Sequence, residues 1–314
     1  MTMKRRHFLQ AASVAVLPSI APAVQSSSLR VIDTHTHFYD PTRPEGVPWP
    51  GKGTKLYRKV LPADWLTLAS VHGCRETVVV EASPRVEDNQ WILDLATREK
   101  SIVGFVGHLD AGPQFEGHLR RFSKNPVFRG IRWNSGHLVD ASKSNAVKIG
   151  ARLLAQLGLE LDLNGSCMGL PAAGKLADEV PDLRIVINHL GAPGDPQDLR
   201  PEWKPAIRDI ARRPNVFMKV SALVEQIKCA EGQAPQDTAY YLPILDYLWQ
   251  QFGPDRLIYG SNWPVSDKGA SYNGVFRIVN EFFSSKGPEA LQKYFLVNSQ
   301  KVYQWVERSS AKSI

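Results

Sequence analysis

The chain contains few cysteines and, beyond its first residues, no long apolar run. Three cysteines, Cys74, Cys167 and Cys229, are spread over 314 residues. Their odd number and wide spacing argue against a disulfide framework. No segment after the N-terminal region is long and apolar enough to span a bilayer. The sequence therefore predicts neither a disulfide-linked fold nor a membrane span in the mature chain.

Positive charge exceeds negative charge only slightly. The chain has 38 Lys and Arg against 31 Asp and Glu, a net charge of +7. Residues 1–26 pair Arg5 with Arg6 and continue with an apolar segment and small residues, which is typical of a twin-arginine export signal. Removing its three cations leaves 35 against 31, or +4, too little to indicate a nucleic-acid partner. Because of this signal, we expect an exported protein, periplasmic or extracellular, whose mature chain comprises residues 27–314.

A Gly-rich dinucleotide fingerprint is also missing, because the first predicted strand leads into DTHTHF. A nucleotide-binding doubly wound sheet thereby loses its main support. Eight apolar runs, starting at residues 29, 76, 102, 128, 159, 183, 215 and 256, alternate with stretches of helical spacing. Strands that are apolar on both faces and joined by helices indicate parallel β/α units. We predict an α/β fold of one domain, a (β/α)₈ TIM barrel.

Two histidines end the first predicted strand, LRVIDTHTHFYD, residues 29–40. Because side chains alternate along a strand, Asp33, His35 and His37 are predicted to share one face. The spacing allows one metal to bind both imidazoles, but a strand with two structural histidines has the same pattern. Residues 40–59, rich in Pro, Gly and basic residues, are predicted to form a long loop at the barrel mouth, where substrate would enter.

Polar and charged residues recur where the predicted strands end. They are His35, His37, Glu81, His108, Arg132, Asp162, Asn164, His189, Lys219, Ser221 and Asn262. In a β/α barrel the active site lies at these ends, and burying unpaired charges is costly. The set therefore indicates a functional site. Arg132 is open to two interpretations, an ion pair with Glu81 or a contact to a substrate carboxylate.

The order of the motifs resembles a known family. The segments DTHTH, VVVEASP, GIRWN, LDLN, LRIVINHLGAP, NVFMKVSAL and RLIYGSNWPVS are similar to the amidohydrolase-related branch of the TIM-barrel metal-dependent hydrolases. That branch includes sugar-acid lactonases, sulfomuconolactonase and pyrone-dicarboxylate lactonase. The resemblance implies a hydrolase that acts on a lactone or related ester of a sugar acid or small anionic compound, with metal-activated water.

The resemblance also implies roles for individual residues. It implies that His35 and His37 bind a divalent metal and that His189 is a further metal ligand or a substrate contact. Neutral imidazoles with an open position for water suit zinc, with manganese as an alternative. The catalytic residues predicted at the strand ends are Glu81, Arg132 and Asn262, and the predicted substrate contacts are Arg132, Asn164 and Trp263.

One position departs from the family pattern. Family members typically end the eighth strand with an aspartate that takes a proton from the attacking water, whereas this chain has Asn262. An amide does not act as a general base near neutral pH, and losing a positioned base typically costs about 10² to 10⁴ in rate. The residue at position 262 therefore determines whether this chain can hydrolyse its substrate by the proton transfer expected for the family.

Three hypotheses follow from this departure. The first is a metal-dependent hydrolase whose base is Glu81, Asp162 or Asp267, with Glu81 favoured because it ends a strand of the same ring. The second is a metal-independent lactonase. The third is an exported binding protein without catalysis, in which Trp49, Trp133 and Trp263 stack on a sugar acid or aromatic acid. The substrate, the metal and the oligomeric state stay open, and the sequence is compatible with a homo-oligomer.

Overall fold

The computed structural model describes residues 29–140 and 144–308, so the predicted export signal lies outside the described residues. Eight strands form one parallel sheet in the order β1-β2-β3-β4-β5-β6-β9-β10. They are β1 (Val31–Thr36), β2 (Cys74–Val80), β3 (Ile102–Gly107), β4 (Phe128–Asn134), β5 (Glu160–Asn164), β6 (Arg184–Ile187), β9 (Val216–Val220) and β10 (Leu257–Tyr259). Each of the eight predicted strands is present.

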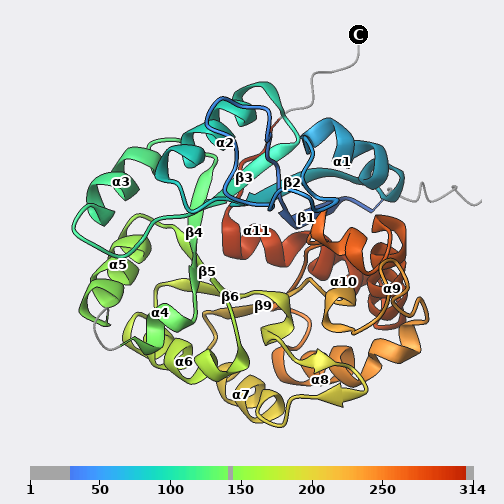
Figure 1. Cartoon of the computed structure of the whole chain (residues 1–314). Helices are drawn as coiled ribbons and strands as arrows, with labels where there is room; N and C mark the ends of the chain where they lie inside the picture. Colours follow the sequence, from blue (N-terminus) through green and yellow to red (C-terminus); the bar gives the residue numbers. More distant parts are fainter. Residues whose placement is uncertain (1–28, 141–143, 309–314) are drawn as a thin grey trace, which may run out of the picture.

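The segment after β10 closes the ring against β1. The backbone N–H of Asn262 donates to the carbonyl of His35 at 2.8 Å, and that of His37 donates to Trp263 at 2.9 Å. The hydroxyl of Thr34 donates to the carbonyl of Tyr259. Parallel pairing around the whole ring buries both faces of the sheet. The fold is therefore the predicted β/α barrel, with helices outside the strands (Figure 1).

Helices follow the strands, and all but the last, which closes one end, lie around the outside of the barrel (Figure 1). They are α1 (Pro62–Ala69), α2 (Val86–Arg98), α3 (Phe115–Phe122), α4 (Gly136–Val139), α5 (Ser144–Gln156), α6 (Leu170–Glu179), α7 (Trp203–Ile210), α8 (Leu242–Phe252), α9 (Tyr272–Ser285), α10 (Pro288–Gln292) and α11 (Asn298–Tyr303). A short hairpin of β7 (Gly194–Asp195) and β8 (Asp198–Leu199) follows β6. Among the described residues, no helix has the length and apolar character needed to cross a bilayer.

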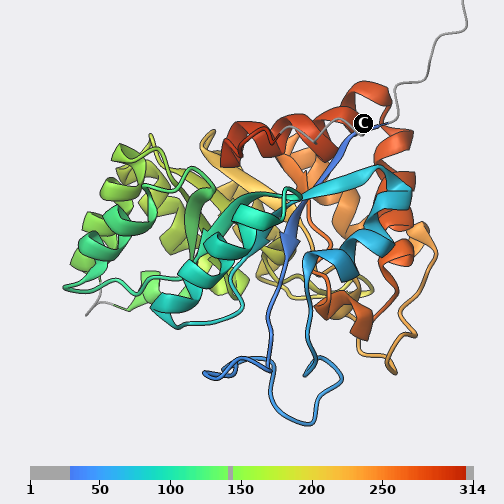
Figure 2. The ribbon, with the colours of Figure 1, turned by 90° about the horizontal axis from the view of Figure 1, so that it is seen from above.

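The two ends of the barrel differ. At one end α11 lies across the opening, and the long loop after β1 projects from the other end (Figures 1 and 2). Val302, Tyr303 and the following Trp305 pack with the inward apolar side chains of the strands, including Ile32 and Phe217. Because α11 fills the end where the strands begin, the end where they finish is left for a site.

A buried ion pair crosses the barrel interior. Nζ of Lys219 donates to Oδ2 of Asp162 at 2.7 Å, and the hydroxyl of Tyr303 donates to Oδ1 at 2.8 Å. Both charged side chains have 0% exposure. Asp162, one of the candidate bases, is therefore held by Lys219 and Tyr303, in a network below the strand ends.

Candidate active site

A cavity of about 370 Å³ opens at the ends of the strands. Its wall includes side chains from six different strand ends or the segments that follow them: His37, Glu81, His108, Arg132, His189 and Asn262, together with Trp49 from the long loop. The barrel therefore gathers most of the polar residues predicted at the strand ends around one cavity, at the end that carries the site in β/α barrels.

The pairing of β1 shifts register between Asp33 and Thr36, and this changes the predicted face of Asp33. Its carboxylate accepts hydrogen bonds from Nε1 of Trp65 on α1 and the hydroxyl of Tyr272 on α9, at 3.3 and 3.2 Å. The prediction that Asp33 shares a face with His35 and His37 is therefore wrong, because the irregularity breaks the alternation of side chains. Asp33 ties β1 to the outer helices instead.

His35 and His37 lie side by side, with ring centroids 5.0 Å apart. Nδ1 of His37 bonds the carbonyl of Val80 at 3.0 Å, and since a carbonyl only accepts, this nitrogen carries the proton. Both ring nitrogens of His35 are buried and have no partner among the described residues. Burial lowers the pKa of His37 to about 4 and that of His35 well below its usual value. Both rings are thus neutral, the form in which imidazole binds a metal.

His189 completes a row of three imidazoles. It follows β6 in a left-handed turn, with φ of 55°, and its ring centroid lies 4.6 Å from that of His35. Nδ1 is 2.9 Å from Oγ of Ser221, at the end of β9, which orients the ring and leaves Nε2 available. Burial lowers the pKa of His189 well below its usual value. A strained backbone at a strand end is typical of a functional position.

The donor chemistry of these three histidines fits a divalent metal. They are neutral and adjacent, and His35 carries two buried ring nitrogens without partners, which a folded protein rarely leaves unsatisfied. However, within the described ranges no group of three or more His, Cys, Asp and Glu side chains is arranged so that it could hold a metal ion. The residue types and their burial therefore fit, although the side chains do not converge into a complete ligand cluster.

Glu81 and Arg132 form an ion pair on the cavity wall. Oε1 of Glu81 accepts from Nε of Arg132 at 2.8 Å and lies 2.7 Å from Nη2, which also donates to the Glu81 carbonyl at 3.0 Å. The side chains are 12% and 15% exposed. Of the two interpretations of Arg132, the ion pair is therefore present. The contacts between the two residues use Nε and Nη2 of Arg132 with Oε1 and the carbonyl of Glu81, so Nη1 and Oε2 take no part in the pair.

Asn262 lines the cavity next to a glutamate that the sequence analysis did not single out. Nδ2 of Asn262 donates to Oε1 of Glu225 at 2.7 Å. Glu225 lies in the 3₁₀ turn Val224–Gln226, after β9. Burial raises the pKa of Glu225 to about 7. The sequence offered little to identify it, because Glu225 follows the last strand residue by five positions and belongs to none of the predicted strand ends.

Three other residues with predicted roles in the site do not line the cavity at the strand ends, which we call the main cavity. Asn164 uses its backbone carbonyl to accept from the N–H of Ser135 at 2.6 Å. Trp263 is buried, with Arg58 over its ring at 5.9 Å. Asp267 lines a separate surface cleft with Arg58. The roles predicted for Asn164 and Trp263 in substrate binding therefore have no support from their position, whereas Trp49 does reach the cavity.

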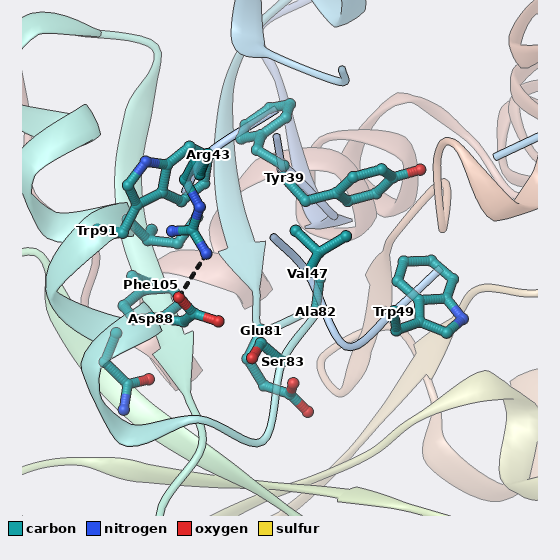
Figure 3. A pocket seen from close by; sticks show the side chains of 13 residues that line it. Tyr39, Arg43, Val47, Trp49, Glu81, Ala82, Ser83, Asp88, Trp91 and Phe105 are labelled. Carbon is teal, nitrogen blue, oxygen red and sulfur yellow. Dashed lines mark hydrogen bonds and ion pairs between the residues drawn. The ribbon is translucent and has the colours of Figure 1, made fainter. Parts of the chain in front are cut away.

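The long loop is held in place beside the cavity. Figure 3 shows a small side pocket in which Arg43 of the loop pairs with Asp88 of α2, at 2.6 Å. The guanidinium also lies 4.7 Å from the ring of Trp91. Trp49 and Glu81 line both this pocket and the main cavity. The anchored loop thus places Trp49 at the cavity, with its ring 5.7 Å from that of His37.

Comparison with known proteins identifies relatives over nearly the whole chain. The model of the amidohydrolase family matches residues 32–305. An L-fucono-1,5-lactonase from Burkholderia ambifaria is 30% identical over 290 residues, which cover 89% of this chain and 97% of that protein. An L-fucono-1,5-lactonase from Burkholderia multivorans is 28% identical over 265 residues, or 81% of this chain and 89% of that one.

Solved structures with a similar fold also cover most of the chain. The crystal structure of an amidohydrolase from Burkholderia multivorans with bound zinc has a TM-score of 0.78 and 25% identity, covering 88% of this chain and 100% of that chain. A probable 2-pyrone-4,6-dicarboxylic acid hydrolase from Acinetobacter baumannii shares the fold, with a TM-score of 0.70 at 17% identity, over 88% and 99% of the two chains. The chain therefore belongs to the amidohydrolase family of hydrolases.

Proposed function

We propose that this hydrolase opens a lactone, or a related carboxylic ester, of a sugar acid or other small polar compound. The observation that carries the proposal is the row of three neutral imidazoles, the buried His35 and His37 and the partly buried His189, beside a cavity walled by Glu81 and Arg132. The similarity to L-fucono-1,5-lactonases supports the same class of substrate.

The ion pair on the cavity wall favours a substrate rich in hydroxyl groups. Since Glu81 neutralises Arg132, the pair attracts a carboxylate less strongly than a free arginine would. Nη1 of Arg132 can donate and Oε2 of Glu81 can accept, and a hydroxyl group both donates and accepts. We therefore favour a sugar-acid lactone over a compound that carries two carboxylates.

Hydrolysis needs water to add to the lactone carbonyl carbon, the ring C–O bond to break, and the departing oxygen to gain a proton. In the proposed reaction Oε2 of Glu81 accepts the proton from the water and later gives it to the departing oxygen. Arg132 holds the carboxylate of Glu81 through Oε1, so Oε2 faces a fixed direction. The product is the open-chain hydroxy acid.

We further propose that His35, His37 and His189 hold a divalent metal, zinc or manganese. When bound there, the metal would polarise the carbonyl and lower the pKa of water. The chain's own contribution is to orient the imidazoles. The carbonyl of Val80 fixes the ring of His37, and the hydroxyl of Ser221 fixes the ring of His189, as partners of metal-binding histidines commonly do.

Metal analysis and an assay panel test the proposal together. Protein purified without chelator is analysed for bound metal and assayed against sugar-acid lactones, simple lactones and esters. Less than about half an equivalent of zinc or manganese, with lactone turnover intact, would support the metal-independent hypothesis instead. Binding of a sugar acid or aromatic acid in calorimetry without turnover of any lactone would support a binding protein.

We also propose that the protein is exported by its twin-arginine segment. Twin-arginine transport carries folded proteins, so a metal could be loaded before export. The prediction is that native protein in the periplasmic or extracellular fraction lacks residues 1–26. N-terminal sequencing tests this directly, because a native protein that begins at Met1 would contradict cleavage, and replacing Arg5 and Arg6 with lysine should hold the protein in the cytoplasm.

A further inference from the structure

The contact between Asn262 and Glu225 joins two strand ends. Asn262 follows β10, whereas Glu225 follows β9, and Nδ2 of Asn262 donates to Oε1 of Glu225 at 2.7 Å. The second oxygen of Glu225, Oε2, is buried and has no hydrogen-bond partner among the described residues. A carboxylate in this position is costly to bury. A role in the site would explain its presence.

The backbone of Asn262 is held on both sides. Its N–H donates to the carbonyl of His35 at 2.8 Å, and its carbonyl accepts from the N–H of Ser266 at 3.1 Å. Its φ is 61°, in the left-handed region that asparagine tolerates better than most residues. With the backbone fixed, the orientation of the side-chain amide is the freedom that remains.

Glu225 determines that orientation. An ionised carboxylate only accepts hydrogen bonds, so the amide must turn its NH₂ group towards Glu225. The carbonyl oxygen, Oδ1, then faces away from Glu225, and the side chain of Asn262 lies beside His37, whose pKa burial lowers and this amide raises, on the wall of the main cavity. A charge-assisted bond to Nδ2 also polarises the amide and makes Oδ1 a stronger acceptor.

We propose that Glu225 is a positioning residue that acts through Asn262, so that the two residues work as a pair at the end of the eighth strand. This inference rests on the proposed hydrolase function. Glu225 holds Oδ1 of Asn262 towards the cavity, where it accepts a hydrogen bond from the attacking water or from a substrate hydroxyl. Asn262 is thus an oriented acceptor, while proton transfer is left to Glu81.

Protonation of Glu225 should release the amide, because a carboxylic acid can donate to Oδ1 and so allow the opposite orientation. Burial raises the pKa of Glu225 to about 7, opposed by the bond to Asn262 and the charge of Lys268. The phenol of Tyr241 also faces Glu225 from the turn Thr238–Tyr241. Turnover should therefore rise with pH through about 7.

The test is Glu225→Gln, with Glu231→Gln as a control that makes the same chemical change at an exposed position nearby. Glutamine can present either an acceptor or a donor to Asn262. We expect Glu225→Gln to lower kcat roughly tenfold with little change in KM. The fall in turnover below about pH 7 should disappear in Glu225→Gln. Glu225→Asp, which keeps a carboxylate, should still show that fall. Wild-type kcat and an unchanged pH profile in Glu225→Gln would overturn the proposal.

A second measurement does not depend on turnover. The side-chain ¹⁵N–¹H signals of Asn262, identified by their loss in Asn262→Asp, should titrate near pH 7 in the wild type and not in Glu225→Gln. An amide that does not titrate would refute the positioning role, even in an active enzyme. An amide that titrates in a protein that hydrolyses no lactone would refute the proposed hydrolase function and leave the contact between the two residues in place.

Discussion

Replacing Asn262 with aspartate should make the stability of the protein depend on pH above neutrality. The substitution places a second carboxylate against Glu225, at the present 2.7 Å contact. Two full charges at that distance repel by roughly 6 kcal/mol with an effective dielectric constant of about 20. The pair avoids this repulsion by keeping one proton between the two carboxyl groups.

The cost of keeping that proton follows from the pKa of Glu225, which burial raises to about 7. Near pH 6 the proton is already present in the wild type, so the variant loses little. Above pH 7 the folded variant must retain a proton that the unfolded chain releases, and its stability falls with rising pH. At pH 9 the loss relative to the wild type is about 2.7 kcal/mol, from two pH units at 1.36 kcal/mol each.

The assay is thermal unfolding of wild type and Asn262→Asp between pH 6 and pH 9. The difference in Tm should be small at pH 6 and reach roughly 5–10 °C at pH 9. Adding Glu225→Gln to Asn262→Asp removes one carboxyl group and should abolish the pH-dependent part of the difference. A Tm difference that stays constant from pH 6 to pH 9 would refute the reasoning, because it would mean that the two carboxyl groups do not interact.

Three further predictions concern the base, the metal and the barrel interior. Glu81→Gln should lower kcat by about 10² to 10⁴, since it removes the proposed proton acceptor, as measured by steady-state kinetics. His189→Ala should lower the zinc content measured after dialysis against a limited zinc buffer, and chelation of the wild type should reduce turnover until zinc is restored. Lys219→Met should cost about 3–5 kcal/mol of unfolding free energy in urea, because it leaves Asp162 buried without its cation.

Each of these variants has a matched control elsewhere on the chain. Glu87→Gln on α2 alters an exposed ion pair with Arg121, and a loss of kcat equal to that of Glu81→Gln would contradict the assignment of the base. His118→Ala on α3 should retain the zinc content of the wild type. Lys148→Met breaks a partly exposed pair with Glu179 and should cost less than about 1 kcal/mol; equal costs at both lysines would contradict the argument from burial.

The positions of the strands and the general place of the site could be predicted from the sequence, because both depend on local patterns. Apolar β-type runs separated by helical stretches indicated eight parallel β/α units, and the polar residues at their ends were expected to meet at one end of the barrel. His37, Glu81, Arg132 and His189 do line one cavity. The orientation of Asp33 could not be predicted, since it depends on a register shift in β1.

The partners of the charged residues were decided only by the tertiary structure. Arg132 binds Glu81 across 51 positions of sequence, Lys219 binds Asp162 across 57, and Asn262 binds Glu225 across 37. These contacts depend on how the strands are arranged around the ring, and no local pattern carries that information. The sequence alone determined the barrel, the family resemblance and the presence of an amide, Asn262, after the eighth strand. The folded chain added Glu225 as its neighbour, because the parallel pairing of β9 with β10 brings together the segments that follow these strands.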